Sequence, residues 1–232
     1  MNQQQAKEIA DKIIGQVFGY QNPFTLEQIM EKFAFDIALP QQVPDSLTGQ
    51  TTWTAAINQA RFMQHEAQMT LPEGNMEKPK RPITSIQDIL TYWQETNTMA
   101  AERYQQSVNV AESDNINRSE NVYRSQDIND SKNIVFCDST FGGAEYLLAS
   151  RRSGASTFCI RLEESAQCSN SFSVNWSAKV VNSLFIQDCY DMQDCMFCSH
   201  MTGKQYWIAN MPFEKDEYFK IRDMVVRWIL TS

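Results

Sequence analysis

Three residues near the C-terminus have the types and spacing of metal ligands. Cys195, Cys198 and His200 form a CxxCxH cluster, and Cys189 lies six positions before it. Thiolate sulfur and imidazole nitrogen are ligands that zinc prefers, and zinc sites often use such short spacings. The cluster therefore predicts a candidate zinc site at these three residues. The favoured alternative treats the same cysteines as small apolar side chains of the core, with no cofactor bound.

A Cys–His catalytic pair is the enzymatic interpretation of the same residues. Nucleophilic catalysis requires a nucleophile, a base and a group that orients the base. The chain contains two histidines, His65 and His200, and Cys198 is close in sequence to the second. Cys198 occupies one of the regularly spaced third positions of the repeat described below and His200, two places later, does not, so the two side chains are not expected to cooperate. No catalytic residue is predicted, and an enzyme is the less favoured class.

A small basic cluster is formed by Arg151, Arg152 and Arg161. Guanidinium groups bind carboxylates and phosphates with two parallel hydrogen bonds, so this cluster is a candidate anion-binding site. Solvated surface is the simpler interpretation. The five tryptophans are spread along the chain and are predicted to be core and cap residues.

These candidate residues lie within a repeat of hexamers. From Ser107 to Phe136 the chain reads SVNVAE, SDNINR, SENVYR, SQDIND and SKNIVF, with Ser first, Asn or Asp third, and Val or Ile fourth. Every third position is therefore small or aliphatic. The pattern slips by one residue around Phe141-Gly142-Gly143 and continues to Cys198. All six cysteines of the chain occupy such third positions.

A period of three fits neither an α-helix, with a period of 3.6, nor a flat strand, with a period of two. A β-solenoid satisfies it, because short strands alternate with corners and every third side chain points inward. Asn and Asp suit the corners because they tolerate left-handed backbone conformations, and stacked Asn side chains can pair between coils. The coil length, twelve or eighteen residues, and the handedness stay open. Residues 145–164 also fit a β-hairpin that projects from the solenoid.

The predicted fold class is α+β: a helical N-terminal region, a triplet or hexapeptide β-solenoid, and a C-terminal capping helix. The corresponding domains are residues 1–105, a docking and capping region, then 106–210 and 211–232. Solenoid ends need caps, so we expect the last helix to seal one end and part of the N-terminal region to seal the other. The elements predicted outside the repeat are helices over 3–18, after Thr25, over 53–69, after Ser85 and over 214–230, strands over 35–39 and 205–210, and a linker over 70–82.

Composition excludes several classes of function. The 232-residue chain has a formal net charge of -8, which repels phosphate backbones and disfavours nucleic acid as a partner. No apolar run approaches the roughly 18 residues of a membrane span. Met1 to Gln5 lacks the layout of a secretory signal, so we expect a soluble protein, cytoplasmic or virion-associated, with free thiols.

The end of the repeat carries a further pattern: Phe197-Cys198, then Lys204-Gln205-Tyr206-Trp207-Ile208-Ala209-Asn210, then Glu217-Tyr218 in the final helix. With it, residues 107–230 resemble uncharacterised Ser- and Cys-rich repeat proteins of bacteria and their phages. The resemblance implies a structural or interaction protein with a protein partner or larger assembly, such as a bacteriophage head-decoration or tail accessory protein.

Two alternative functions stay open. One is a metal- or ligand-binding module at the Cys-rich end. The other is a hexapeptide-type acyltransferase, a class built on a left-handed β-helix. In that class a small residue lies two places before the aliphatic one, whereas here Ser lies three places before it.

Overall fold

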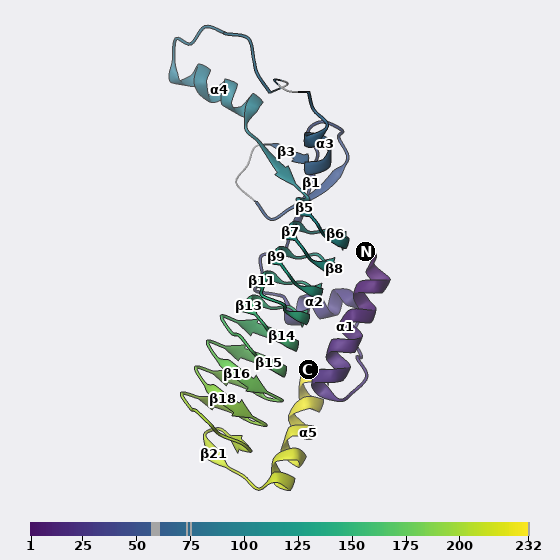
Figure 1. The fold of residues 1–232 in the computed structure, drawn as a ribbon, viewed down its shortest axis with the longest axis vertical. Helices are drawn as coiled ribbons and strands as arrows, with labels where there is room; N and C mark the ends of the chain where they lie inside the picture. Colours follow the sequence, from purple (N-terminus) through teal and green to yellow (C-terminus); the bar gives the residue numbers. More distant parts are fainter. Residues whose placement is uncertain (57–60, 73, 75, 232) are drawn as a thin grey trace.

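The computed structural model describes residues 1–56, 61–72, 74 and 76–231. It shows N-terminal helices, a β-solenoid of about nine turns over residues 104–208, and a C-terminal helix (Figure 1). The predicted fold class is therefore confirmed. The division into three domains at 105 and 210 stays a prediction.

Each turn of the solenoid contains twelve residues. Val108 lies opposite Glu120 in a parallel ladder, and Glu120 lies opposite Lys132. This spacing excludes the eighteen-residue coil. The strands of the turns are β5 (Tyr104–Gln105), β6 (Val108–Ala111), β7 (Asp114–Asn117), β8 (Glu120–Tyr123), β9 (Gln126–Asn129), β10 (Lys132–Val135), β11 (Asp138–Phe141), β12 (Glu145–Leu148), β13 (Arg151–Gly154), β14 (Thr157–Glu163), β15 (Ser169–Asn175), β16 (Ala178–Val181), β17 (Leu184–Gln187), β18 (Tyr190–Gln193) and β19 (Met196–Ser199).

A left-handed backbone at every third residue explains the period of three. Asn109 and Glu112, for example, have φ of 56° and 52°, and the series runs to Ala209. Each twelve-residue turn therefore has four bends and four inward positions. Asn and Asp adopt this conformation at low cost, which agrees with their predicted place at corners. Arg118 and Trp176 adopt it as well, so the stacking of turns imposes it on residue types that ordinarily avoid it.

Two glycines absorb the predicted slip in the repeat. Lys132 lies opposite Glu145, thirteen residues later, and Gly142 and Gly143 between them have φ of 70° and 79°. Glycine takes these left-handed values without steric cost, so one extra residue fits in the corner. Glu145 then pairs in parallel with Thr157. The hairpin interpretation of residues 145–164 is wrong, because this segment continues the solenoid.

An apolar column on the outside of the solenoid binds the terminal helices. Its members, one per turn, are Ala111, Tyr123, Val135, Leu148, Ile160, Phe172, Leu184, Met196 and Ile208. They pack with buried residues of α1 (Gln3–Phe18), α2 (Leu26–Phe33) and α5 (Lys215–Thr231). In Figure 1, α1 and α5 run along one flank of the solenoid. The last helix thus covers this flank, which differs from the expected position over an end.

The first turn of the solenoid is covered by residues 41–101. This region contains an antiparallel pair, β1 (Gln41–Pro44) and β2 (Thr51–Thr54), and a parallel pair, β3 (Arg61–Gln64) and β4 (Thr98–Ala101). It also contains α3 (His65–Met69) and α4 (Ile86–Thr96). The Glu102 amide donates to the Trp53 carbonyl at 3.2 Å, and Thr54 Oγ1 donates to the Asp114 carboxylate at 3.2 Å. Part of the N-terminal region therefore covers this end, as expected.

At the other end, polar side chains follow the inward ladder. Lys204 and Asn210 occupy ladder positions in the last turn. Lys204 Nζ lies 5.0 Å from the centre of the Trp207 ring, and Asn210 bonds to both the amide and the carbonyl of Ser199. The short strands β20 (Trp207–Ile208) and β21 (Met211–Pro212) pair antiparallel there. A lysine at a strand edge discourages further strand addition.

Outside the solenoid, the predicted helices that begin at a capping residue are confirmed. Asn2, Thr25 and Ser85 each form a capping box, at the starts of α1, α2 and α4. The helix over 53–69 is wrong, because β2, β3 and the short α3 occupy its described part; residues 57–60 lie outside the described residues. No strand forms over 35–39, and the strand over 205–210 shortens to β20. Among the described residues, no helix has the length and apolarity to cross a bilayer.

Candidate functional site

The Cys-rich end separates the three predicted zinc ligands. Cys195 and Cys198 are buried, and their thiols donate to the carbonyls of Gln193 and Met196 at 3.2 and 3.3 Å. The His200 side chain is 73% exposed and its Nδ1 lies 2.9 Å from the Asp188 carboxylate. The two thiols lie together in the interior while the imidazole lies outside. Within the described residues, no three or more His, Cys, Asp or Glu side chains form a metal-binding group. The zinc site stays a prediction.

Serine and cysteine have the same structural role in the solenoid interior. Ser119 Oγ donates to the carbonyl of Asn117, two residues earlier, at 2.8 Å. It also accepts from the amide of Ser131, one turn later, at 3.2 Å. Cys189 reproduces both contacts through Sγ, with the Gln187 carbonyl and the Met201 amide. Each such side chain satisfies backbone groups of two turns, which explains why small hydrogen-bonding residues recur inside a narrow core.

The interior also controls the chemistry of the thiols. All six cysteines are free and buried. Burial raises the pKa of Cys137 to about 12 and that of Cys168 to about 11, because a thiolate is poorly solvated there. The adjacent Cys195 side chain lowers the pKa of Cys198 from its ordinary value. Cys198 is only 1% exposed, so its sulfur cannot act as a nucleophile towards a molecule in solution.

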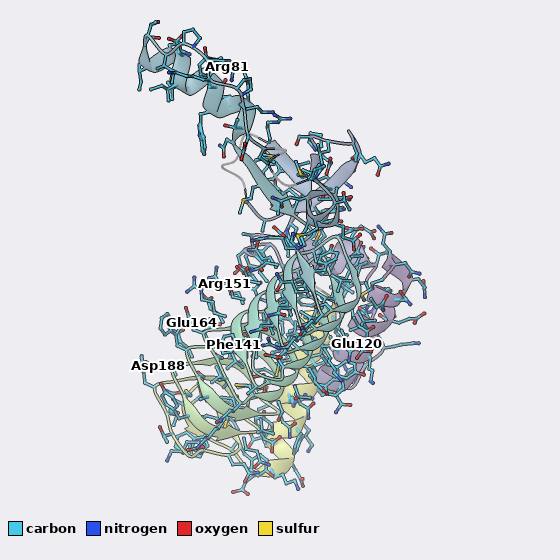
Figure 2. All side chains as sticks on the ribbon, turned by 45° about the horizontal axis from the view of Figure 1, so that its top comes forward. Arg81, Glu120, Phe141, Arg151, Glu164 and Asp188 are labelled. Carbon is cyan, nitrogen blue, oxygen red and sulfur yellow. The ribbon has the colours of Figure 1, made fainter. Side chains whose placement is uncertain are left out.

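The basic cluster is neutralised by carboxylates. Two arginines pair with acidic residues one turn later, Arg151 with Glu163 and Arg152 with Glu164; Figure 2 labels Arg151 and Glu164 on the outside of the solenoid. These pairs join consecutive turns. A free anion therefore meets no uncompensated charge at Arg151 or Arg152.

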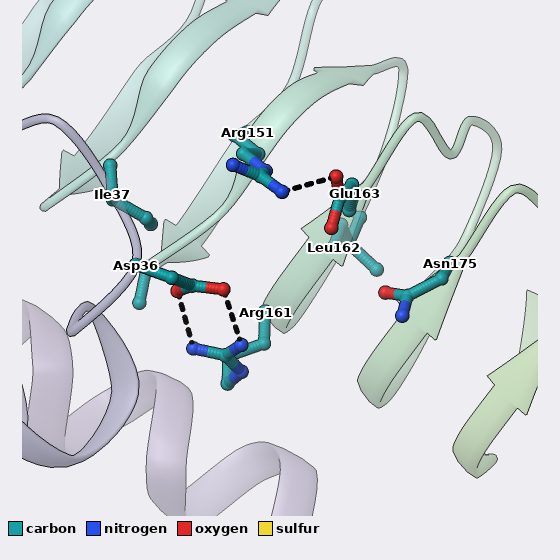
Figure 3. Close-up of a pocket in the computed structure, with 8 residues that line it drawn as sticks. Asp36, Ile37, Arg151, Arg161, Leu162, Glu163 and Asn175 are labelled. Atoms are coloured by element: carbon teal, nitrogen blue, oxygen red, sulfur yellow. Dashed lines mark hydrogen bonds and ion pairs between the residues drawn. The ribbon is translucent and has the colours of Figure 1, made fainter.

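Arg161 attaches the segment after α2 to the solenoid. Its two terminal nitrogens each lie 2.9 Å from an oxygen of Asp36 (Figure 3). Nη1 also donates to the Phe33 carbonyl. The hydrogen bond from Arg161 lowers the pKa of Asp36. The adjoining pocket holds about 10 Å³, roughly the space for one water. This arrangement suits docking of the N-terminal helices better than binding of a ligand.

Further polar pairs connect successive turns along the outside. Lys132 and Glu120 lie 3.7 Å apart, and Arg118 and Asp130 lie 2.6 Å apart. Asn109 donates to Asn121 at 2.7 Å, as the predicted stacking of the Asn column requires. Every one of these pairs spans twelve residues. The charged surface of the solenoid therefore contributes to its rigidity.

His65 begins α3, at the opposite end of the solenoid from Cys198 (Figure 1). Its Nδ1 is buried and has no hydrogen-bond partner among the described residues. The structure thus brings neither histidine into contact with a cysteine thiol in the part of the chain that it describes.

Sequence reasoning missed the surface around α4. Its apolar residues Ile86, Ile89, Leu90 and Trp93 are 70%, 45%, 47% and 56% exposed, and no residue of the helix is buried. Figure 1 shows α4 on an arm that projects away from the solenoid. The prediction that all tryptophans are core or cap residues is wrong for Trp93, and Trp176 and Trp228 are likewise exposed, at 61% and 54%. The signal was available in the spacing i, i+3, i+4 and i+7, which defines one apolar face of a helix.

Comparisons with protein-family models, with curated proteins and with solved structures found no match to this chain. The structure describes it as a β-solenoid repeat protein with Ser-rich buried ladders and six buried cysteines.

Proposed function

We propose that this protein is a structural or interaction protein, in which a rigid β-solenoid presents the α4 arm to a partner within a larger assembly. The observation that carries the proposal is the exposed apolar face of α4. Contiguous apolar surface on a folded protein ordinarily marks an interaction site.

The distribution of reactive side chains supports the same proposal. The thiols are hydrogen-bonded to backbone groups inside the solenoid, and the arginines of the basic cluster form ion pairs with carboxylates. The His200 imidazole contacts the Asp188 carboxylate. These groups contribute to holding turns and helices together. A solenoid of this kind is a stiff, extended support, which is a common use of repeat architectures.

The sequence resemblance suggests a particular assembly, a phage virion, with this chain as a head-decoration or tail accessory protein. The support for that assignment is the Ser- and Cys-rich repeat pattern of residues 107–230. It is tested by fractionating lysate of the source by size and detecting this chain with an antibody. Migration with particles is the expected result. Migration only as a free species of 26.7 kDa contradicts membership of a large assembly.

A further inference from the structure

A groove runs beside α4, between the helix and the preceding segment 78–83. Arg81 holds the two walls together: its guanidinium lies 2.8 and 3.1 Å from the Glu95 carboxylate oxygens and 3.7 Å from the centre of the Tyr92 ring. The Tyr92 hydroxyl donates to the Pro82 carbonyl at 3.1 Å. The groove is thus formed by contacts within the arm, where Figure 2 labels Arg81.

The groove has an apolar floor and a basic rim. It encloses about 360 Å³, enough for two or three apolar side chains. Ile83, Ile89 and Trp93 line it and are 59%, 45% and 56% exposed. Lys78 and Lys80 also line it, and neither forms an ion pair with a carboxylate among the described residues. An apolar occupant with negative charges at its edge would complement both features.

A bound partner that covers the exposed apolar face of α4 would stabilise this helix. The helix α4 has 11 residues, and an isolated helix of this length is marginally stable in water. Its few hydrogen bonds barely offset the conformational entropy lost when the first turn forms. The capping box at Ser85 and the Arg81–Glu95 pair offset part of this cost. The exposed stripe of Ile86, Ile89, Leu90 and Trp93 contributes little until another surface covers it. Amphipathic helices commonly bind their partners through such i, i+3, i+4, i+7 anchors.

We propose that the arm binds an acidic amphipathic segment of another protein. Apolar side chains of that segment fill the groove between residues 78–83 and α4, and its carboxylates pair with Lys78 and Lys80. This proposal rests on the proposed function, because it specifies the chemistry of the partner to which the solenoid presents the α4 arm.

Charge selects this occupant over a second copy of the chain. Lys78 and Lys80 place two cations within three positions, beside Arg81, which is already paired with Glu95, whereas the whole chain carries a formal net charge of -8. Two such chains repel one another at low ionic strength. An acidic segment meets the basic rim on an arm that projects away from the body of the molecule (Figure 1).

The test uses full-length protein and three labelled synthetic peptides of about 16 residues, long enough to form a helix. The first carries Leu on one helical face and Glu elsewhere, the second replaces Glu by Lys, and the third replaces Leu by Ser. Fluorescence anisotropy is expected to show the first peptide binding about tenfold tighter or more than the other two, with an affinity that falls as salt is added. Equal binding of the Glu and Lys peptides would overturn the proposal.

Matched variants locate the binding. The double variant Lys78→Glu/Lys80→Glu and the variant Trp93→Ala should each lose about tenfold in affinity for the Glu peptide. The control is Lys215→Glu/Lys220→Glu, which changes the net charge equally at exposed positions of α5. Losses that are the same in arm and control variants overturn the proposal. Sedimentation equilibrium gives one more outcome: a dimer of the wild type that Ile89→Asp dissociates would assign the groove to a second copy and overturn the proposal.

Fractionation of lysate that contains the arm variants distinguishes the two proposals. Wild-type migration with particles, kept by Lys78→Glu/Lys80→Glu, would overturn the acidic segment as the occupant and leave the interaction function standing, because that variant keeps the apolar face of α4. Failure of the wild type to migrate with particles would contradict the assembly function, whatever the peptides show.

Discussion

Ser177 Oγ accepts a hydrogen bond from the amide of Cys189, one turn later, at 3.0 Å, and donates to the carbonyl of Asn175 at 2.7 Å. Ser177 is 3% exposed, so no water replaces either contact when the hydroxyl is removed. One side chain thus satisfies a donor and an acceptor of two different turns.

Ser177→Ala should lower the free energy of unfolding by about 1–3 kcal/mol, because it leaves the Cys189 amide buried without an acceptor. Ser177→Cys should cost less, since Cys189 makes the same pair of contacts through sulfur. Ser177→Leu should cost roughly 1–3 kcal/mol or more by overpacking. Denaturant unfolding followed by circular dichroism measures all three changes.

The matched control for overpacking is Glu120→Leu, whose side chain points away from the core and is 49% exposed. Figure 2 labels Glu120 on the outside of the solenoid. This change should be nearly neutral. Equal losses for Ser177→Leu and Glu120→Leu would contradict the inward ladder.

Glu102 should make the protein less stable as pH rises. Burial raises the pKa of Glu102 above its usual 4.5, so the folded state binds its proton more tightly than the unfolded state does. Stability from this group is complete below pH 4.5 and is lost as pH rises through the higher folded pKa. Glu102→Gln should therefore stabilise the protein at pH 7 and flatten the dependence of the melting temperature on pH from 4.5 upward. A variant less stable than wild type at pH 7 would show that the carboxylate is needed.

The six thiols should be unreactive in the native protein. They are buried, so a reagent cannot reach their sulfur atoms. Burial also raises the pKa of most of them, so they carry little of the reactive thiolate form. Ellman's reagent at pH 8 should label them only after denaturation. Rapid labelling of Cys198 alone would instead indicate that the last turns open and expose the one thiol whose pKa is lowered.

Metal analysis tests the CxxCxH cluster directly. Because the His200 imidazole lies outside the solenoid and both thiols lie inside, we expect His200→Ala to leave the zinc content of purified protein unchanged. Stoichiometric zinc that is lost in His200→Ala and in Cys195→Ser would support the ligand set named from the sequence. It would also require the last turn to rearrange.

Tyr218→Phe should be neutral or stabilise the protein by up to about 1 kcal/mol. The Tyr218 hydroxyl is fully buried and has no hydrogen-bond partner among the described residues, while its ring packs beside Tyr206 and Phe219. The ring contacts survive in phenylalanine. The control is Tyr123→Phe, which removes a 2.8 Å hydrogen bond to Glu112 and should destabilise by about 1 kcal/mol. Thermal unfolding of both variants measures the difference.

The predicted outlines of α1, α2, α4 and α5 match the structure because caps and apolar spacing are local signals. The segment 53–69 was predicted wrongly as a helix because its strands pair with residues distant in sequence, such as Arg61 with Thr98. Short apolar runs do not distinguish helix from strand without those partners.

The sequence by itself determined the β-solenoid, its inward ladder and the slip at Gly142-Gly143, because each follows from side-chain size and backbone preference at regular spacing. Only the tertiary structure decided the twelve-residue turn, the place of α5 on the flank and the exposure of the α4 face. The turn length depends on which strands pair between turns. The positions of α5 and α4 depend on which apolar surfaces are covered by other parts of the chain. The triplet ladder also explains why His200 lies apart from the thiols of Cys195 and Cys198, because only the two cysteines occupy its inward positions.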